Sequence, residues 1–98
     1  MLNKYLLPDK NIRSRVIDGE TVLLNLKDNS IYFLNPTGNL IWNMANGKTK
    51  IQKIIDKICR EFKVDYNVAQ KDAINFIKGL LKKNMLNLYD KPKLMPKD

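Results

Sequence analysis

The sequence predicts an α+β domain of the winged helix-turn-helix type, in which a three-stranded antiparallel sheet is followed by three helices. Three short runs with strand character come first, separated by tight turns at Asp18-Gly19 and at residues 27–30. Helical spacing of apolar residues replaces the strand pattern from Asn35 onward. Because two tight turns in a row make a meander, we expect a small sheet with one face covered by the helices.

The expected strands are residues 12–17, 21–26 and 31–34. Asp18-Gly19 is one of the strongest two-residue hairpin signals, and it joins the first two strands. In the second strand, alternation places Val22, Leu24 and Leu26 on one face. Asp and Asn tolerate left-handed backbone, so the Lys27–Ser30 segment predicts the turn into the third strand.

Three helices are expected after the strands. Asn35 is a suitable cap for the first helix, with Pro36 at its first position and Asn46-Gly47 as its end. Residues 49–52 match a capping box and predict the start of the second helix. The third helix is expected from about Asp65 or Asn67 to about Asn84. The apolar stripes are Ile51, Ile54, Ile55, Ile58 and Phe62 in the second helix, and Ala69, Ala73, Phe76, Ile77 and Leu80 in the third.

The 98 residues fit one domain, which we place at residues 12–88. Residues 1–11 are expected to be a flexible N-terminal segment. Residues 89–98 are expected to be a flexible tail, because they hold two prolines and five charged residues. The chain has no run of about 18 apolar residues and no secretory signal, so we expect a free-standing cytoplasmic protein without a membrane partner.

The composition argues against an enzyme. The chain has no histidine and a single cysteine, Cys59, which removes histidine-based catalysis, most zinc sites and any internal disulfide. We find no paired carboxylates, phosphate-binding glycine loop or metal-ligand spacing, so no cofactor is expected. The formal charge of +8 predicts attraction to an acidic partner, either nucleic acid or an acidic peptide.

One stretch carries a resemblance to a known family. Residues 32–42 read YFLNPTGNLIW, with Leu-Asn-x-Thr-Gly followed by Ile-Trp, and with the hairpin at Asp18-Gly19 they resemble the PqqD-like family. The similarity covers about residues 12–88. It implies a winged-helix-like domain, a recognition element for the leader segment of a ribosomally synthesised, post-translationally modified peptide. Further residues in register with the family are Val22, Leu23, Leu24, Gly47, Val64, Ala69, Asp72, Phe76, Leu80 and Leu81.

The resemblance also implies where the leader binds. In the family, the leader adds as a strand to the third strand and lies in the groove between that strand and the third helix. The domain then presents the precursor to a modifying enzyme, either a radical-SAM protein or a leader peptidase and cyclase. We expect Ile74 and Leu81 to line pockets, and the neighbouring lysines to pair with leader carboxylates. The expected peptide-binding residues are Ser30, Ile31, Tyr32, Phe33, Leu34, Lys71, Ile74, Asn75, Lys78, Leu81 and Lys82.

The alternative is a winged-helix DNA-binding protein, suggested by the +8 charge and the pair formed by the second and third helices. Against it, the third helix offers Asn67, Gln70 and Lys71 near its start but contains no arginine. Nucleic acid is therefore not the expected partner. An exposed edge strand also allows pairing with another copy, so we expect a monomer or a weak or swapped homodimer.

Overall fold

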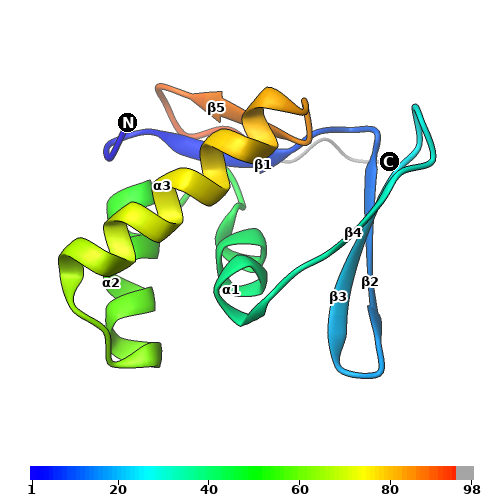
Figure 1. Cartoon of the computed structure of the whole chain (residues 1–98). Helices are drawn as coiled ribbons and strands as arrows, with labels where there is room; N and C mark the ends of the chain where they lie inside the picture. The colour runs from blue at the N-terminus through cyan, green and yellow to red at the C-terminus, as the bar shows by residue number, and fades with distance from the viewer. Residues whose placement is uncertain (95–98) are drawn as a thin grey trace.

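The computed structural model describes residues 1–94, which form five strands and three helices (Figure 1). The α+β winged helix-turn-helix arrangement is confirmed, with a three-stranded antiparallel sheet before the three helices. A second sheet of two strands was not predicted. The elements are β1 (Tyr5–Pro8), β2 (Ile12–Ile17), β3 (Glu20–Asn25), β4 (Ile31–Phe33), α1 (Pro36–Met44), α2 (Ile51–Phe62), α3 (Tyr66–Lys82) and β5 (Leu86–Tyr89).

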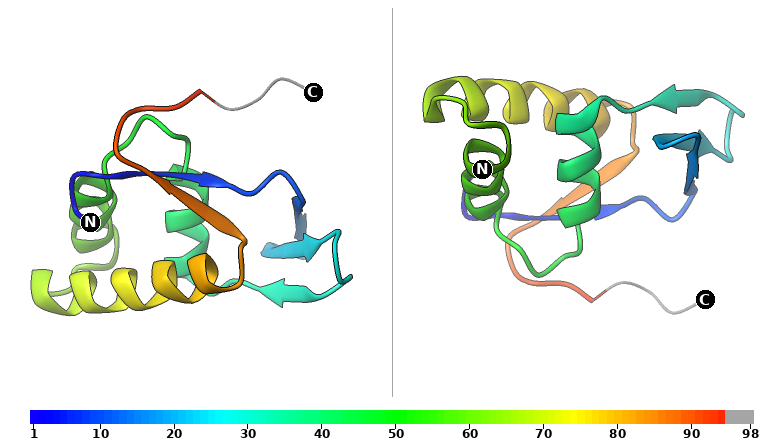
Figure 2. Two further views of the ribbon diagram at one scale, coloured as in Figure 1. Left: turned by 90° about the horizontal axis from the view of Figure 1, so that it is seen from above. Right: turned by 90° about the horizontal axis from the view of Figure 1, so that it is seen from below.

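Strands β2, β3 and β4 form a wing that stands to one side of the helices (Figure 1). Asp18 and Gly19 both have positive φ, 52° and 82°, as the predicted tight hairpin requires. Ile12 at the base of β2 is buried, whereas the other five residues of that strand are exposed. The helices therefore cover only the base of the wing, because the hairpin extends beyond the helical part (Figure 2).

Val22 and Leu24 share one face of β3, as the alternation predicts, but the opposite face meets the main core. Leu23, on that opposite face, is fully buried in the main hydrophobic core, while Val22 is 8% exposed, Leu24 is half-buried and Leu26, beyond the end of β3, is 47% exposed. Apolar residues stand on both faces of this strand, so pattern alone could not tell the core face from the outer face.

The predicted helix cap at Asn35 is confirmed, and a second side-chain cap is present at Asp65, near the expected start of the third helix. The side-chain oxygen of Asn35 accepts a hydrogen bond from the Gly38 amide at 2.7 Å, with Pro36 in the first position of α1. Asp65 caps α3 by accepting from the Asn67 amide at 3.2 Å. These caps fix the start of α1 directly after β4 and the start of α3 directly after the turn from α2.

The capping box predicted over residues 49–52 is wrong. The N-cap of α2 is Lys50, and its side chain makes no capping hydrogen bond. The first two amides of the helix instead donate to the backbone carbonyls of Lys4 and Leu2, at 3.0 and 2.9 Å. The N-terminal segment thus satisfies the donors that a capping side chain would otherwise take.

The N-terminal segment is part of the fold. β1 pairs with β5 in antiparallel register, and Leu6 and Leu7 are buried (Figure 2). The flexible segment predicted over residues 1–11 is therefore replaced by a strand over residues 5–8, and Tyr89 of the predicted tail belongs to β5. Two adjacent leucines are too short a pattern to predict a strand whose partner lies at the other end of the chain. Residues 95–98 of the tail lie outside the described residues.

The hydrophobic core lies among the three helices and the two-stranded sheet. Trp42 is buried in it, as predicted, and four isoleucines of α2 form its centre. Phe62, the last residue of the predicted α2 stripe, is 39% exposed. Cys59 is half-buried with a free thiol. Among the described residues, no helix combines the length and the apolar character that crossing a membrane requires.

Candidate functional site

Strand β4 has one unpaired edge. The strand order is β2-β3-β4, so β4 is bonded to β3 on one side only. The amide of Leu34 donates to the Thr21 carbonyl at 2.9 Å, and the amide of Asn25 donates to the Ser30 carbonyl at 2.9 Å. Hydrogen-bonded and non-hydrogen-bonded pairs alternate along an antiparallel ladder. Ser30, Tyr32 and Leu34 therefore bond to β3, while the residues between them direct their N–H and C=O groups to the open edge.

Those two residues are Ile31 and Phe33. Together they offer two donors and two acceptors along the open edge, with the spacing that another strand needs. Their side chains are 58% and 69% exposed on the face of the sheet turned away from the core. Tyr32 and Leu34 point the other way and pack against the core.

The C-terminal end of helix α3 lies near β4. α3 and β4 run along the same side of the molecule in both views of Figure 2. The ammonium group of Lys83, just after α3, lies 4.5 Å from the ring centre of Tyr32 in β4. Successive helix residues turn by about 100°, so Asp72, Phe76 and Gly79 share the flank of α3 that ends at Lys83.

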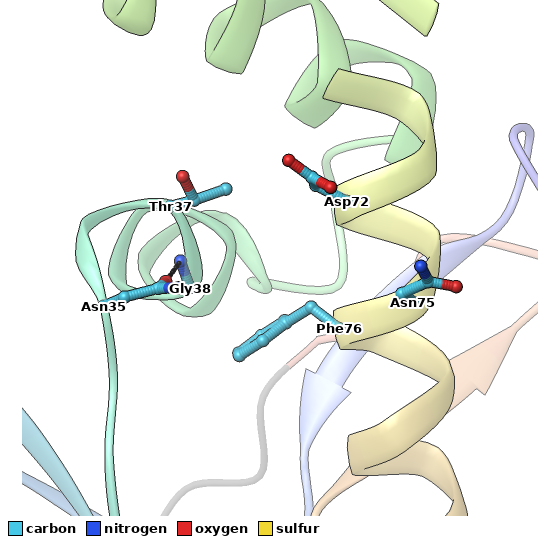
Figure 3. A pocket seen from close by; sticks show the side chains of 6 residues that line it. All are labelled: Asn35, Thr37, Gly38, Asp72, Asn75 and Phe76. Carbon is cyan, nitrogen blue, oxygen red and sulfur yellow. Dashed lines mark hydrogen bonds between the residues drawn. The ribbon is translucent and has the colours of Figure 1, made fainter. Parts of the chain in front are cut away.

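A pocket of about 300 Å³ opens where β4 passes into α1 (Figure 3). Its floor is a close contact between α1 and α3, because a Cβ atom on Gly38 would lie only 2.7 Å from Cε1 of Phe76. Figure 3 shows Thr37 and Asp72 pointing into the same opening from the two helices. The lining residues are Asn35, Thr37, Gly38, Asp72, Asn75 and Phe76.

We call this combination the edge site: the open edge of β4, the α3 flank from Asp72 to Lys83, and the pocket at the β4–α1 junction. Charge differs between its two ends. At one end, the ammonium group of Lys83 makes a cation–π contact with the ring of Tyr32. Asp72 provides a carboxylate at the pocket end, among amide and hydroxyl groups.

The turn that leads into β4 is held by a carboxylate. Asp28 accepts hydrogen bonds from the Ser30 hydroxyl at 2.6 Å and from the Ser30 amide at 2.9 Å. These bonds hold the pKa of the Asp28 carboxyl below its ordinary value, with the hydroxyl bond as the larger cause. Asn29, within the same turn, has a positive φ of 61°. The side chains of the turn thus set the direction in which the open edge begins.

The structure brings together some of the site residues named from the sequence and separates others. Ile31 and Phe33 form the open edge itself, Ser30, Tyr32 and Leu34 bond to β3 beside it, and Asn75 borders the pocket. Ile74, Lys78 and Leu81 lie on the flank of α3 opposite to Asp72, Phe76 and Gly79, by the same helical rotation. Leu81 packs against the core, Lys78 and Lys82 are exposed, and Lys71 and Ile74 border a separate hollow with Asn67, Gln70 and Asn75.

Sequence reasoning missed several groups at the edge site. Phe76 was assigned to the core stripe, but it is half-buried and also lines the pocket. Gly79 is exposed, with nothing within 4 Å of where a Cβ atom would lie, and Lys83 was not considered. The spacing i, i+4, i+7, i+11 from Asp72 to Lys83 was the available signal. It was overlooked because the wider apolar and lysine stripes dominate this helix.

The fold and the edge site define a small winged-helix recognition domain with an open sheet edge. A family model described as Coenzyme PQQ synthesis protein D (PqqD) matches residues 20–86, more than half of the chain. The chain therefore belongs to the PqqD family, and the resemblance seen in the sequence is confirmed. A comparison with curated proteins finds no match.

Two solved structures share the fold. TbiB1, solved in complex with the TbiA(beta) leader peptide, is 30% identical with a TM-score of 0.74, over 82% of this chain and 93% of that chain. A lasso peptide synthetase B1, complexed with its leader peptide, is 20% identical with a TM-score of 0.74, over 84% of this chain and 96% of that chain. At 20% identity, the second structure supports the fold alone.

Proposed function

We propose that this protein binds the leader segment of a ribosomally synthesised, post-translationally modified precursor peptide by strand addition at the edge site. The observation that carries the proposal is the open edge of β4, where Ile31 and Phe33 direct unpaired backbone groups beside α3. An extended peptide satisfies such groups whatever its sequence. Membership of the PqqD family and the likeness to TbiB1, a structure that contains a leader peptide, support this assignment.

The register of the sheet determines where the leader side chains go. A leader strand bonds to Ile31 and Phe33, so its residues opposite these two place their side chains on the outer face of the wing. The leader residue opposite Tyr32 places its side chain on the other face, toward Lys83 and the α3 flank. Alternate leader residues thus meet two different surfaces of the domain.

Backbone pairing alone does not supply the affinity. Four edge hydrogen bonds contribute about 0.5–1.5 kcal/mol each, while micromolar binding needs about 8 kcal/mol net and ordering the leader costs about 2–5 kcal/mol. Apolar anchors supply the difference, at about 1.5–3 kcal/mol for each fully buried side chain. Phe76 in the pocket and the exposed Ile31 and Phe33 are the apolar surfaces available at the edge site.

The charged groups select the leader. Lys83 favours an acidic leader side chain beside Tyr32, and the exposed Lys71 and Lys82 add a cationic rim that speeds capture more than it tightens it. Ser30 to Leu34 and Asn75 remain contact residues in this proposal, joined by Phe76, Gly79 and Lys83. Ile74, Lys78 and Leu81 lie outside it, on the opposite flank of α3.

The proposed role is binding without catalysis. The domain holds the leader in the cytoplasm and presents the precursor to a modifying enzyme, either a radical-SAM protein or a leader peptidase and cyclase. An open edge that binds a leader is blocked when it pairs with another copy, so we propose that the active form is the monomer.

The test is a fluorescence-anisotropy titration with labelled leader segments from short open reading frames beside this gene. A random DNA duplex is titrated in parallel at two salt concentrations. We expect saturable, salt-tolerant binding of one leader, with amide shifts in β4 and α3 by NMR. Lys83→Glu should weaken this binding, and Lys53→Glu, the same charge change on an exposed residue of α2, should not. If no leader binds and the domain binds duplex DNA with a sequence preference, the domain is a DNA-binding protein instead.

A further inference from the structure

The outer face of the wing has an ordered arrangement of side chains. The pairing register places Arg15, Val22 and Phe33 in one row across β2, β3 and β4. The next row is Arg13, Leu24 and Ile31. Each row therefore runs from an arginine on β2, through an aliphatic residue on β3, to a large apolar residue on β4. We call this surface the outer wing face.

The ends of both rows on the outer wing face are exposed, whereas at the centre Val22 is only 8% exposed and Leu24 is half-buried. Phe33 and Ile31 are 69% and 58% exposed, and Ile17, which continues the face at the hairpin end of β2, is 52% exposed. Both arginines are exposed as well. Among the described residues, the helices and the two-stranded sheet all lie on the other side of the wing (Figure 1). Aromatic and arginine side chains together are the residue types enriched at protein–protein interfaces.

The outer wing face is continuous with the edge site. Ile31 and Phe33 direct their backbone groups to the open edge and their side chains to this face. A leader strand paired to them places its own alternate side chains in the same plane, next to the apolar end of each row. Leader binding therefore widens the outer wing face by one strand.

We propose that the outer wing face is the docking surface for the modifying enzyme, which offers an apolar surface with an acidic rim. The inference rests on the proposed leader binding, because the leader strand forms part of the surface that the enzyme contacts. The apolar ends of the rows, at β4 and the leader, meet the apolar surface of the enzyme. Arg13 and Arg15, at the β2 end, meet its acidic rim.

Charge distinguishes the enzyme from a second copy of this chain as the occupant. The chain carries +8, and the outer wing face holds two of its three arginines against one carboxylate, Glu20, opposite Ile17, so its net charge is positive. Placing two such surfaces together would bring like charges toward each other, which costs free energy. An acidic rim on a different protein removes that cost, so the charge of the face favours a heterologous partner.

The experiment uses the whole chain and the purified radical-SAM or peptidase and cyclase proteins encoded beside its gene. Binding is measured by biolayer interferometry with and without leader. Arg15→Glu and Ile17→Ser change the outer wing face away from the β4 edge. Val16→Ser alters the neighbouring residue, which is 73% exposed on the opposite face of β2, and Arg60→Glu repeats the charge reversal on α2.

We expect one enzyme to bind the wild-type chain. Arg15→Glu and Ile17→Ser should weaken that binding about tenfold or more, as loss of an interface anchor does. The two control variants should stay within about twofold, and all four should bind the leader as the wild type does. Leader should raise the affinity for the enzyme, and the enzyme should raise the affinity for leader by the same factor.

Three results would overturn the proposal: equal enzyme binding by all four variants, leader binding without binding of any of the enzymes, or a homodimer in sedimentation equilibrium that Arg15→Glu and Ile17→Ser dissociate. The last result would assign the face to a second copy. Failure of the wild-type chain to bind any leader would instead refute the proposed function itself, so the two failures are distinguishable.

Discussion

Replacing Ile31 by proline tests strand addition directly. Ile31 pairs with Leu24 in a non-hydrogen-bonded position, so its N–H points to the open edge and takes no part in the β3–β4 ladder. Proline removes that donor and places its ring where the leader backbone would approach, while the bonds to β3 remain. Proline is tolerated on an edge strand in this orientation.

The loss can be estimated from one missing donor. In Ile31→Pro, the leader carbonyl that faces residue 31 has no N–H donor, and leaving it unpaired costs about 1–3 kcal/mol. At about 1.4 kcal/mol for each factor of ten, Ile31→Pro should weaken leader binding about 5- to 150-fold. Ile31→Ala isolates the contribution of the side chain, and its loss should be smaller because it keeps the N–H donor.

The assay combines leader anisotropy titrations with urea unfolding of each variant. Val16→Pro is the matched control, because Val16 pairs with Thr21 in a non-hydrogen-bonded position and points its N–H to the opposite edge of the sheet. Ile31→Pro and Val16→Pro should unfold at similar urea concentrations, and only the first should lose leader affinity. Equal leader affinity for Ile31→Pro and Ile31→Ala would refute the assignment of the β4 edge as the site.

Three further predictions concern stability. Gly47→Ala should lower the free energy of unfolding by about 2–4 kcal/mol in urea titrations, because Gly47 has a φ of 76° and a Cβ atom there would overlap the Lys93 carbonyl oxygen; an unchanged midpoint would show that the C-terminal segment does not pack there. Leu6→Ala should cost about 2–5 kcal/mol, since Leu6 is fully buried, and wild-type stability would mean that β1 is not part of the folded state in solution. The Asn11 amide donates to Asp9 at 3.0 Å and, as the largest cause, holds the pKa of the Asp9 carboxyl below its ordinary value. The stability that Asp9→Ala removes should therefore be complete at neutral pH, above the pKa of Asp9 in the unfolded chain, and should vanish as the pH falls through its lower folded-state pKa. A pH-independent difference between the two proteins would contradict that assignment.

The elements with local signals were predictable from the sequence. Asp18-Gly19 specifies a two-residue hairpin by backbone conformation alone, and Asn35-Pro36 specifies the start of a helix by one side-chain acceptor and one fixed φ. The isoleucine stripe of α2 indicates that one face of this helix is buried. In each of these cases, the information lies within a few neighbouring residues.

The elements that depend on distant partners were not predictable. Strand β1 is specified by its pairing with β5, and the segment before it is held by hydrogen bonds from α2 to the carbonyl groups of Leu2 and Lys4; neither partner appears in residues 5–8 themselves. The same limit applied to the site. Which flank of α3 faces β4 depends on how the helix is rotated against α1, and the contact between Gly38 and Phe76 sets that rotation.

Pairing of β1 with β5 has a consequence for the timing of folding. The side chains of Asp9 and Asn87, 78 positions apart, are joined by a hydrogen bond beside this pair of strands. During synthesis, the wing hairpin can form early from local contacts, but β1 has no partner until residues 86–89 have been made. Closing so long a loop also carries a large entropy cost. A nascent chain therefore emerges from the ribosome with buried leucines still uncovered, and it completes its folding only after translation has passed the last strand.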